Sequence, residues 1–221
     1  MRTYFWIALR YLVNFKREKF ISFMSLISLL GVAIGVMTLI IVLGVMSGFD
    51  RDLKSKILGL NYELIVDKPI GIADNDKIFA QFSSFPEVTA FSPFVSGQAL
   101  LMSDERFIGV HIRGIDLARE MKINSISSFI KVGSGSLNPQ ELLVGEELFK
   151  QLDLKLGQPI NIFSPITNKH YPFRVGGIFK SGYYDYDLNL VFSNIEDAQS
   201  LMFMEGFYSG VGLKMLLMCL V

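Results

Sequence analysis

The side chains in this sequence that are best suited to chemistry are two histidines and a pair of acids. His111 and His170 are the only histidines, and neither has a second metal-ligating side chain at a suitable spacing. Asp185 and Asp187 alternate in the run GYYDYD, and alternate residues of a strand point to one face, as the paired acids of a glycosidase would. No substrate cleft is implied, and the neighbouring tyrosines favour a solvated interaction edge. We predict no catalytic residue and no metal ligand.

Sequence motifs for nucleotide binding and nucleophilic catalysis are absent. There is no G-x-x-x-x-G-K-[ST] run to cradle phosphates and no G-x-S-x-G run to present a nucleophile. The 21 Lys and Arg residues balance 21 Asp and Glu residues, so the chain has no net charge to attract nucleic acid. A single cysteine, Cys219, excludes an internal disulfide. The sequence predicts a non-enzymatic protein without a cofactor.

An apolar run organises the rest of the chain. No charged residue lies between Lys19 and Asp50. A bilayer core of roughly 30 Å needs about 20 apolar helical residues, so residues 20–49 are predicted to form one transmembrane helix. The run is roughly twice the length of a signal-peptide core, and no cleavage site follows it. Basic residues lie on both sides of the run, so charge alone leaves its orientation open.

The preceding residues 1–19 form an amphipathic, basic leader. RTYFWIALRYLV carries apolar side chains at helical spacing, and NFKREK adds positive charge next to the membrane. Two structures fit this pattern. One is an interfacial helix on the inner leaflet, held by anionic membrane lipid and Trp6; the other is an ordinary leader that packs on neighbouring helices.

Two pairs of small residues lie within the apolar run. Gly31 and Gly35 form one small-xxx-small pair, and Gly44 and Gly48 form a second. Such pairs allow the backbones of two helices to approach closely. At about 100° per residue the second pair lies roughly 140° around the helix from the first, which predicts different neighbours at the two ends. The alternative is that glycine is simply frequent in membrane helices.

Beyond the membrane we expect a helical stalk over residues 50–60. The apolar stripe of the membrane helix continues there, and Asp50–Lys54 and Asp52–Lys56 are favourable i,i+4 pairs.

Residues 61–221 are predicted to form an α+β domain, with strand pairs and short interleaved helices. A hairpin is predicted around Asp104 and Glu105. The expected strands are 62–68, 88–103, 106–115, 141–145, 158–164, 171–179, 188–192 and 208–214, and the expected helices are 77–85, 116–121, 146–152 and 195–203, with a loop at 131–139.

Three stretches together resemble one protein family. IALRYL, SLISLLGVAIGVMTLIIVLGVMSGFDRDLKSKILGL and GIFKSGYYDYDLNLVFSNIEDAQSLM are similar to the permease subunits of the lipoprotein-releasing ABC transporter, of the LolC/LolE type. The resemblance extends to about Leu213. The general layout is shared with other exporters that have a MacB-like periplasmic domain.

The resemblance implies a four-helix permease of the bacterial inner membrane whose first helix leads into a periplasmic domain. The N-terminus would be cytoplasmic and residues from Asp50 onward periplasmic. A second permease subunit and separate ATPase subunits would be its partners, and ATP hydrolysis would drive release of lipoproteins to a periplasmic carrier. Met46 and Phe49 would contact the lipoprotein in a cavity, although ordinary helix packing or lipid contact explains these positions equally well.

A protruding hairpin engages the carrier in the family. The matching loop is short here, so carrier binding by this subunit stays open; its residues are Pro165, Ile166, Thr167, Asn168, Lys169, His170, Tyr171 and Pro172. The chain also ends inside the expected domain, and its tail MLLMCLV does not match a polar continuation. We interpret this as a truncated or split reading frame. The alternative functions are a single-span, membrane-anchored periplasmic scaffold without transport activity and a permease for another substrate.

Overall fold

A computed structural model of the chain describes residues 4, 6–7, 19–74, 76–103, 106–133 and 137–216, with the side chains of 19, 21–22 and 51–58 left out. The chain divides into two compact units, Met1–Leu53 and Lys54–Val221, and each is considered by itself. Most of the predicted leader lies outside the described residues. The same holds for the hairpin turn at 104–105, for most of the terminal tail and for the side chains of the predicted stalk pairs.

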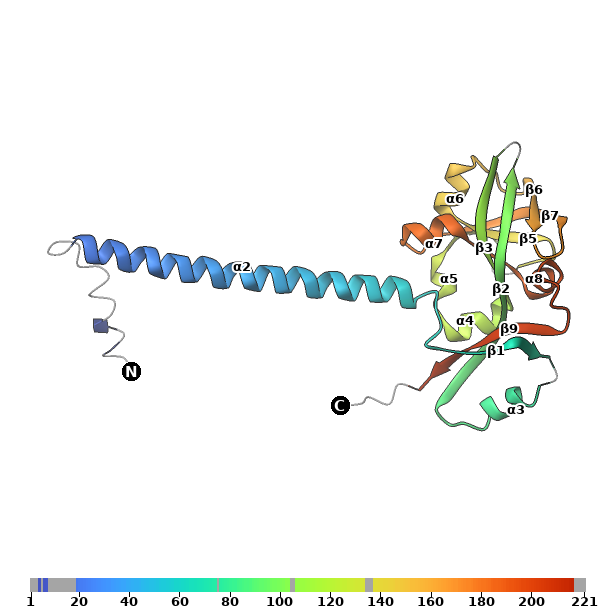
Figure 1. The fold of residues 1–221 in the computed structure, drawn as a ribbon, viewed down its shortest axis with the longest axis horizontal. Helices are drawn as coiled ribbons and strands as arrows, with labels where there is room; N and C mark the ends of the chain where they lie inside the picture. The colour runs from blue at the N-terminus through green and yellow to red at the C-terminus, as the bar shows by residue number, and fades with distance from the viewer. Residues whose placement is uncertain are drawn as a thin grey trace. The chain divides into compact units, whose positions relative to one another are not determined.

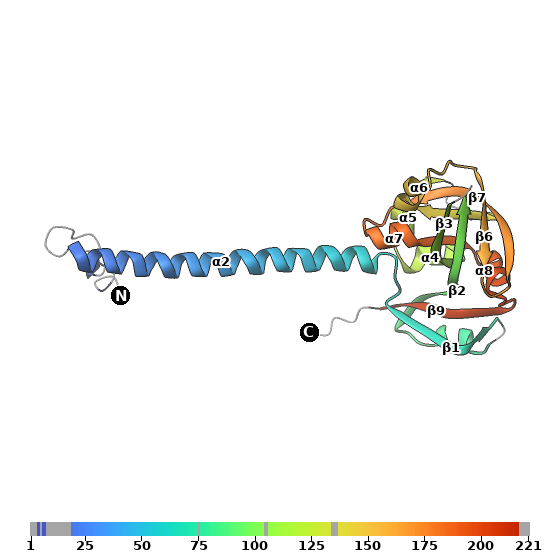
Figure 2. The same ribbon diagram turned by 45° about the horizontal axis from the view of Figure 1, so that its top comes forward.

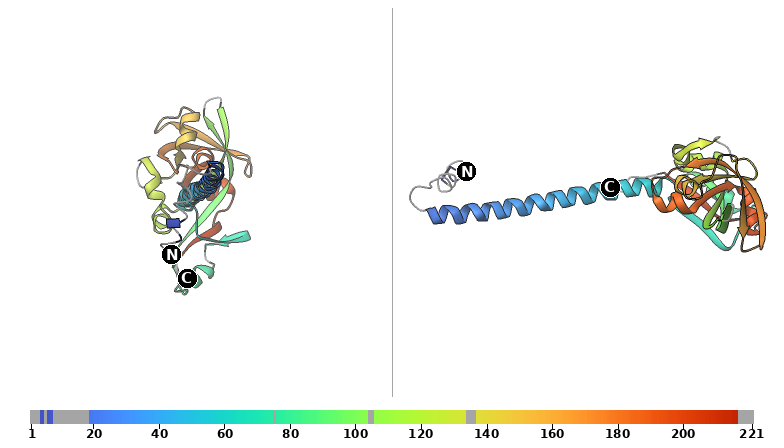
Figure 3. Two further views of the ribbon diagram at one scale, coloured as in Figure 1. Left: turned by 90° about the vertical axis from the view of Figure 1, so that its left-hand side faces the viewer. Right: turned by 90° about the horizontal axis from the view of Figure 1, so that it is seen from above.

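A single long helix, α2 (Lys19–Leu58), contains the apolar run. Within it, residues Phe23–Asp50 are long and apolar enough to cross a membrane. At 1.5 Å per residue these 28 residues measure about 42 Å, more than a bilayer core of roughly 30 Å. The helix includes both glycine pairs. Its ribbon is continuous in Figure 3.

The following residues fold into an α+β domain, which confirms the predicted fold class. Short helices alternate with strands that belong to one sheet (Figure 1). The strands are β1 (Leu64–Ala73), β2 (Val88–Ser103), β3 (Arg106–Ile115), β4 (Ile130–Gly133), β5 (Glu141–Gly145), β6 (Pro159–Ser164), β7 (Lys169–Phe179), β8 (Leu190–Asn194) and β9 (Phe207–Met215). The helices are α3 (Ile78–Phe82), α4 (Leu117–Ile123), α5 (Ile126–Phe129), α6 (Glu146–Gln151), α7 (Tyr184–Asn189) and α8 (Ile195–Met202).

Six of the strands close into a ring. Their order is β2-β3-β8-β5-β7-β6, and β6 returns to pair with β2 at Leu100–Met102. The interior is apolar and includes fully buried Leu101, Ile112, Val144 and Ile162. Closure removes the exposed edges that an open sheet would leave, and it provides the main core of the domain.

A smaller lobe extends from the ring along the first half of β2. There β9 pairs with residues 88–94 of β2, and β1 pairs with β9, so the three strands lie side by side (Figure 2). Helix α3 packs against this lobe and contributes Phe82 to its core beside Ile72 and Val211. The Asp76 carboxylate accepts a hydrogen bond from the Ile78 amide at 3.2 Å, at the first residue of α3.

Most predicted strands and helices are confirmed within a few residues, and β2 and β3 form the predicted hairpin. Three segments differ. Residues 126–129 form helix α5, where no element was predicted. Residues 130–133 form strand β4 where a loop was expected, because they pair with the edge of β7. Residues 184–189 form helix α7, which was not predicted, and β8 begins at Leu190, two residues later than expected. The contacts that stabilise α7 come from residues outside it, described below.

Candidate functional site

The four predicted helix-packing glycines all lie on α2. A Cβ atom added at Gly31, Gly35, Gly44 or Gly48 would meet nothing within 4 Å. Their surfaces are therefore open in this chain, and approach by a second helix remains a prediction.

The two predicted cavity residues also lie on the membrane helix. Met46 is 64% exposed and Phe49 is 57% exposed. At 100° per residue they lie about 60° apart, whereas the midpoint of Gly44 and Gly48 lies about 150° from theirs. This end of the helix therefore presents a small-residue face and an opposite face with two large, flexible or aromatic side chains.

The predicted carrier loop is a tight turn between β6 and β7. Ser164 pairs with Lys169 in the ladder, so only residues 165–168 are outside the strands. Asn168 has a φ of 54°, and its amide donates to the Ser164 carbonyl at 2.9 Å. The Thr167 amide donates to the Ser164 hydroxyl at 3.3 Å. Ile166, at the tip, is 60% exposed.

The other predicted loop residues belong to β7, which begins two residues earlier than expected. Lys169, His170, Tyr171 and Pro172 all pair with β6. The His170 ring packs beside Phe163, with ring centroids 5.1 Å apart. The loop prediction was wrong for Lys169 and His170, because the hydrogen-bonded turn allows the β6–β7 ladder to continue to Lys169, whereas Tyr171 and Pro172 lie in the strand predicted for 171–179.

The two groups considered for catalysis do not form an active site. No group of three or more metal-ligating side chains occurs among the described residues. His111 lies on β3, and burial together with the charge of Arg113 lowers its pKa. Asp185 is exposed but Asp187 is buried, so the two acids do not act as a pair.

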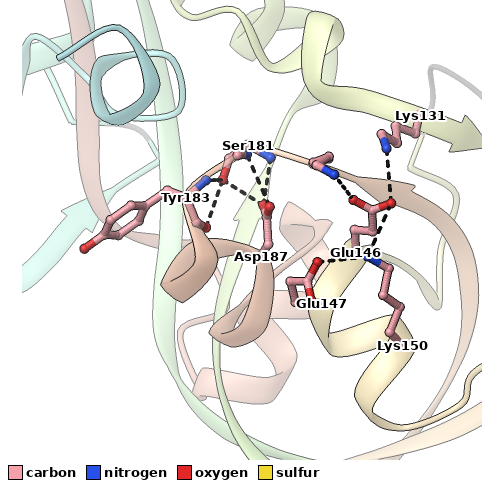
Figure 4. Close-up of polar contacts among 9 residues, drawn as sticks. Lys131, Glu146, Glu147, Lys150, Ser181, Tyr183 and Asp187 are labelled. Atoms are coloured by element: carbon pink, nitrogen blue, oxygen red, sulfur yellow. Dashed lines mark hydrogen bonds and ion pairs between the residues drawn. The ribbon is translucent and has the colours of Figure 1, made fainter. Parts of the chain in front are cut away.

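The carboxylate of Asp187 holds the turn that precedes α7. It accepts hydrogen bonds from the Ser181 amide and hydroxyl, both at 2.7 Å, and from the Gly182 amide at 3.2 Å (Figure 4). These bonds fix the backbone just before the Tyr183 N-cap of α7. They explain why a helix forms in the run that was predicted to be a solvated interaction edge.

An ion-pair cluster lies beside this turn (Figure 4). Glu146, at the start of α6, pairs with Lys180 at 2.6 Å, with Lys131 of β4 at 3.1 Å and with Lys150 at 3.7 Å. Hydrogen bonds from Lys180 and Lys131 lower the pKa of Glu146 to about 2. The cluster connects α6 to β4 and to the residue that follows β7.

The residues after the long helix are attached to three elements of the domain. The Ser125 amide donates to the Gly59 carbonyl at 3.2 Å, and Arg113 Nη1 of β3 donates to the Leu60 carbonyl at 3.1 Å. Asn61 Nδ2 donates to the Tyr186 hydroxyl of α7 at 2.8 Å. We call Gly59–Tyr62 the entry segment, because the chain enters the domain there.

Tyr62 completes this attachment in the interior. Its ring stacks on Phe94 with centroids 5.0 Å apart, and the Arg113 guanidinium lies 5.6 Å from its centre. The adjacent Glu120 is fully buried, and this burial raises its pKa, although Asn124 donates to it at 2.6 Å. The sequence reasoning missed this cluster, because its members are far apart along the chain and form no motif.

Comparison with known proteins agrees with this architecture. The family described as the MacB-like periplasmic core domain matches residues 25–214. LolC, a lipoprotein-releasing system transmembrane protein from Xylella fastidiosa (strain Temecula1), is 34% identical over 95% of this chain and 53% of its own length. LolC from Neisseria meningitidis serogroup B is 32% identical over 95% of this chain and 54% of its length.

The solved structures support the fold. The extracellular domain of the noncanonical ABC-type transporter YknZ from Gram-positive bacteria superposes with a TM-score of 0.50 at 13% identity, covering 67% of this chain and 75% of that domain. The chain spans about half the length of the LolC proteins it matches. It belongs to the family with a MacB-like periplasmic core domain, and the resemblance to LolC/LolE-type permeases is confirmed.

Proposed function

We propose that this chain supplies the first membrane helix and the periplasmic domain of a permease that releases lipoproteins from the bacterial inner membrane. The observation that carries the proposal is the LolC similarity over 95% of the chain, which includes a membrane-length helix and the MacB-like core. The chain itself is non-catalytic in this proposal. A separate ATPase subunit supplies the energy, and a second permease subunit completes the membrane part.

The proposed orientation places the N-terminus in the cytoplasm and the residues from Asp50 onward in the periplasm. Gly31 and Gly35 would contact one neighbouring helix, and Gly44 and Gly48 another. Met46 and Phe49 would contact lipoprotein acyl chains on the face opposite the second pair. The β6–β7 turn, with Ile166 at its tip, is the proposed contact for a periplasmic lipoprotein carrier.

A membrane-anchored scaffold without transport activity is the second candidate. The observation in its favour is the closed ring of strands with its own apolar core, the kind of rigid folded unit that an interaction module requires. A scaffold needs one anchor but has no need of two helix contact faces.

Assembly in the membrane distinguishes the two functions. The tagged full chain is co-expressed with the ATPase and second permease of its own organism, and their co-purification is measured for Gly35→Leu and Gly48→Leu. We expect each variant to reduce recovery of at least one partner several-fold, because leucine blocks close helix approach. Ala33→Leu is the matched control. Residue 33 lies between Gly31 and Gly35 along the helix, but its side chain points about 160° away from Gly31. Unchanged recovery in both glycine variants would favour the scaffold, and absence of both partners with the unaltered chain would contradict the permease.

A further inference from the structure

A groove crosses the outer surface of the closed ring between the β6–β7 turn and the start of β8. It encloses about 500 Å³, within the roughly 300–1,000 Å³ typical of small-molecule sites. Strand register explains its direction: Leu100 of β2 pairs with Gly109 of β3, and His111 of β3 pairs with Leu190 of β8. Its lining residues are Gln98, Ala99, Leu100, Gly109, Val110, His111, Pro165 and Asn189.

The described residues that line this groove are uncharged. They include no Asp, Glu, Lys or Arg, although 19% of the chain is charged. Burial and the charge of Arg113 lower the pKa of His111, so its imidazole is neutral at pH 7. Leu100 is 41% exposed on the groove floor. A phosphate or carboxylate would find no cation in this lining, whereas a hydrocarbon would cover exposed apolar surface.

Gly109 keeps the centre of the groove open without a structural need for glycine. A Cβ atom added there would meet nothing within 4 Å, and its φ is not in the left-handed region. Two other glycines of the same hairpin differ, because a Cβ at Gly97 would overlap Met202 and one at Gly114 would overlap Ala198. A glycine inside a strand weakens it and often marks a place where a ligand approaches closely.

We propose that this groove binds an acyl chain of the lipoprotein after it leaves the membrane helices. The proposal rests on the proposed permease function and adds a substrate site within the aqueous domain. The uncharged lining suits a hydrocarbon chain. The absence of a side chain at Gly109 deepens the middle of the groove, and one end of the groove lies at Pro165 in the β6–β7 turn. The groove therefore offers apolar cover for a hydrocarbon chain within the aqueous domain, next to that turn.

Photolabelling of the full chain tests the proposal. The permease complex in lipid nanodiscs is incubated with a triacylated lipopeptide that carries a diazirine on one acyl chain, irradiated, and mapped by mass spectrometry. We expect label on β2 and β3 peptides that contain Leu100 and Gly109. Gly109→Trp should reduce this label at least fivefold, because the indole occupies the groove. Ile65→Trp, on the exposed strand β1 of the smaller lobe, should leave the label unchanged.

A second variant distinguishes loss of binding from a folding defect. Gln98→Arg places a charge at an exposed groove position and should also reduce the label, while thermal unfolding of both variants stays close to that of the unaltered chain. Label near Met46 and Phe49 with none in the groove would overturn this inference and leave the permease function standing. Equal groove labelling by a diazirine phospholipid would also overturn it as a substrate site. Absence of label from both regions would count against the permease proposal as well.

Discussion

At the scale of single residues, buried or paired carboxylates determine much of the local structure. Asp187 orders the turn before α7 through three hydrogen bonds, and Glu146 ties α6 to two lysines from other elements. Both acids occur near the start of a short helix, where negative charge is favourable. Lys131 and Lys180 are far from Glu146 along the chain, and the Asp187 bonds depend on a turn that residue type alone does not reveal, so neither role was predicted from the sequence.

Replacing Asp187 should be costly, whereas replacing its neighbour should not. Asp187→Ala leaves the Ser181 and Gly182 amides without their acceptor, and loss of hydrogen bonds to a buried charged group costs about 2–4 kcal/mol. Asp185→Ala alters an exposed side chain and should change stability by no more than about 0.5 kcal/mol. Urea unfolding followed by circular dichroism measures both. Equal effects of the two variants would show that Asp187 does not hold the turn.

The stabilisation by Glu146 should disappear in acid. Its pKa is lowered from 4.5 to about 2 in the folded domain, so the ionised form is favoured by folding. Its contribution is therefore present above pH 4.5 and is lost as the pH falls towards 2. The difference in Tm between the unaltered chain and Glu146→Gln should be constant near neutral pH and shrink below pH 4.5. A difference that is independent of pH down to 2 would contradict this assignment.

At the scale of secondary-structure elements, the entry segment and β9 meet through one close contact. Gly212 of β9 lies against the Tyr62 ring, and any Cβ there would overlap the ring atoms. Tyr62 is also held by Phe94 and Arg113, so it has little freedom to move aside. The packing of the entry segment within the domain thus requires a glycine in a strand that follows Tyr62 by about 150 residues.

A methyl group at this contact should loosen the attachment. Gly212→Ala should destabilise the domain by about 1–3 kcal/mol through overpacking, and it should speed amide hydrogen exchange in residues 59–62. Gly109→Ala is the matched strand control, because its added methyl group meets open space. It should be neutral or slightly stabilising. Comparable destabilisation by both substitutions would mean that strand flexibility, and not Tyr62, is responsible.

The elements themselves were largely predictable from local patterns. The long β-prone runs at 88–103 and 106–115 and the capped helix beginning after Asp116 have strong local signals, and they form as expected. Strand β4 and helix α7 depend on partners elsewhere in the chain, so propensity alone did not identify them. The uncharged groove also escaped prediction, because only strand register brings Leu100 and Gly109 together.

At the scale of the whole molecule, the sequence match identifies the family, and the structural similarity supports the fold. The family match covers residues 25–214, which includes most of α2 and the domain. Transport requires a path enclosed by several helices, and the described residues contain one helix of membrane-crossing length. The proposed activity therefore belongs to an assembly, and co-purification with its partners is the relevant measurement.

Strand β2 has an edge that is shared by two different partners. Residues 88–94 of that edge pair with β9 and residues 100–102 pair with β6, while the opposite edge pairs with β3. A slip of β2 by one residue would turn Leu101 outward and would also break the alignment with both β9 and β6. Neither lobe can thus adopt a wrong register while the other remains correct. The register of β2 thus sets the strand pairing of both lobes. We expect the two lobes to fold and unfold together in one cooperative transition.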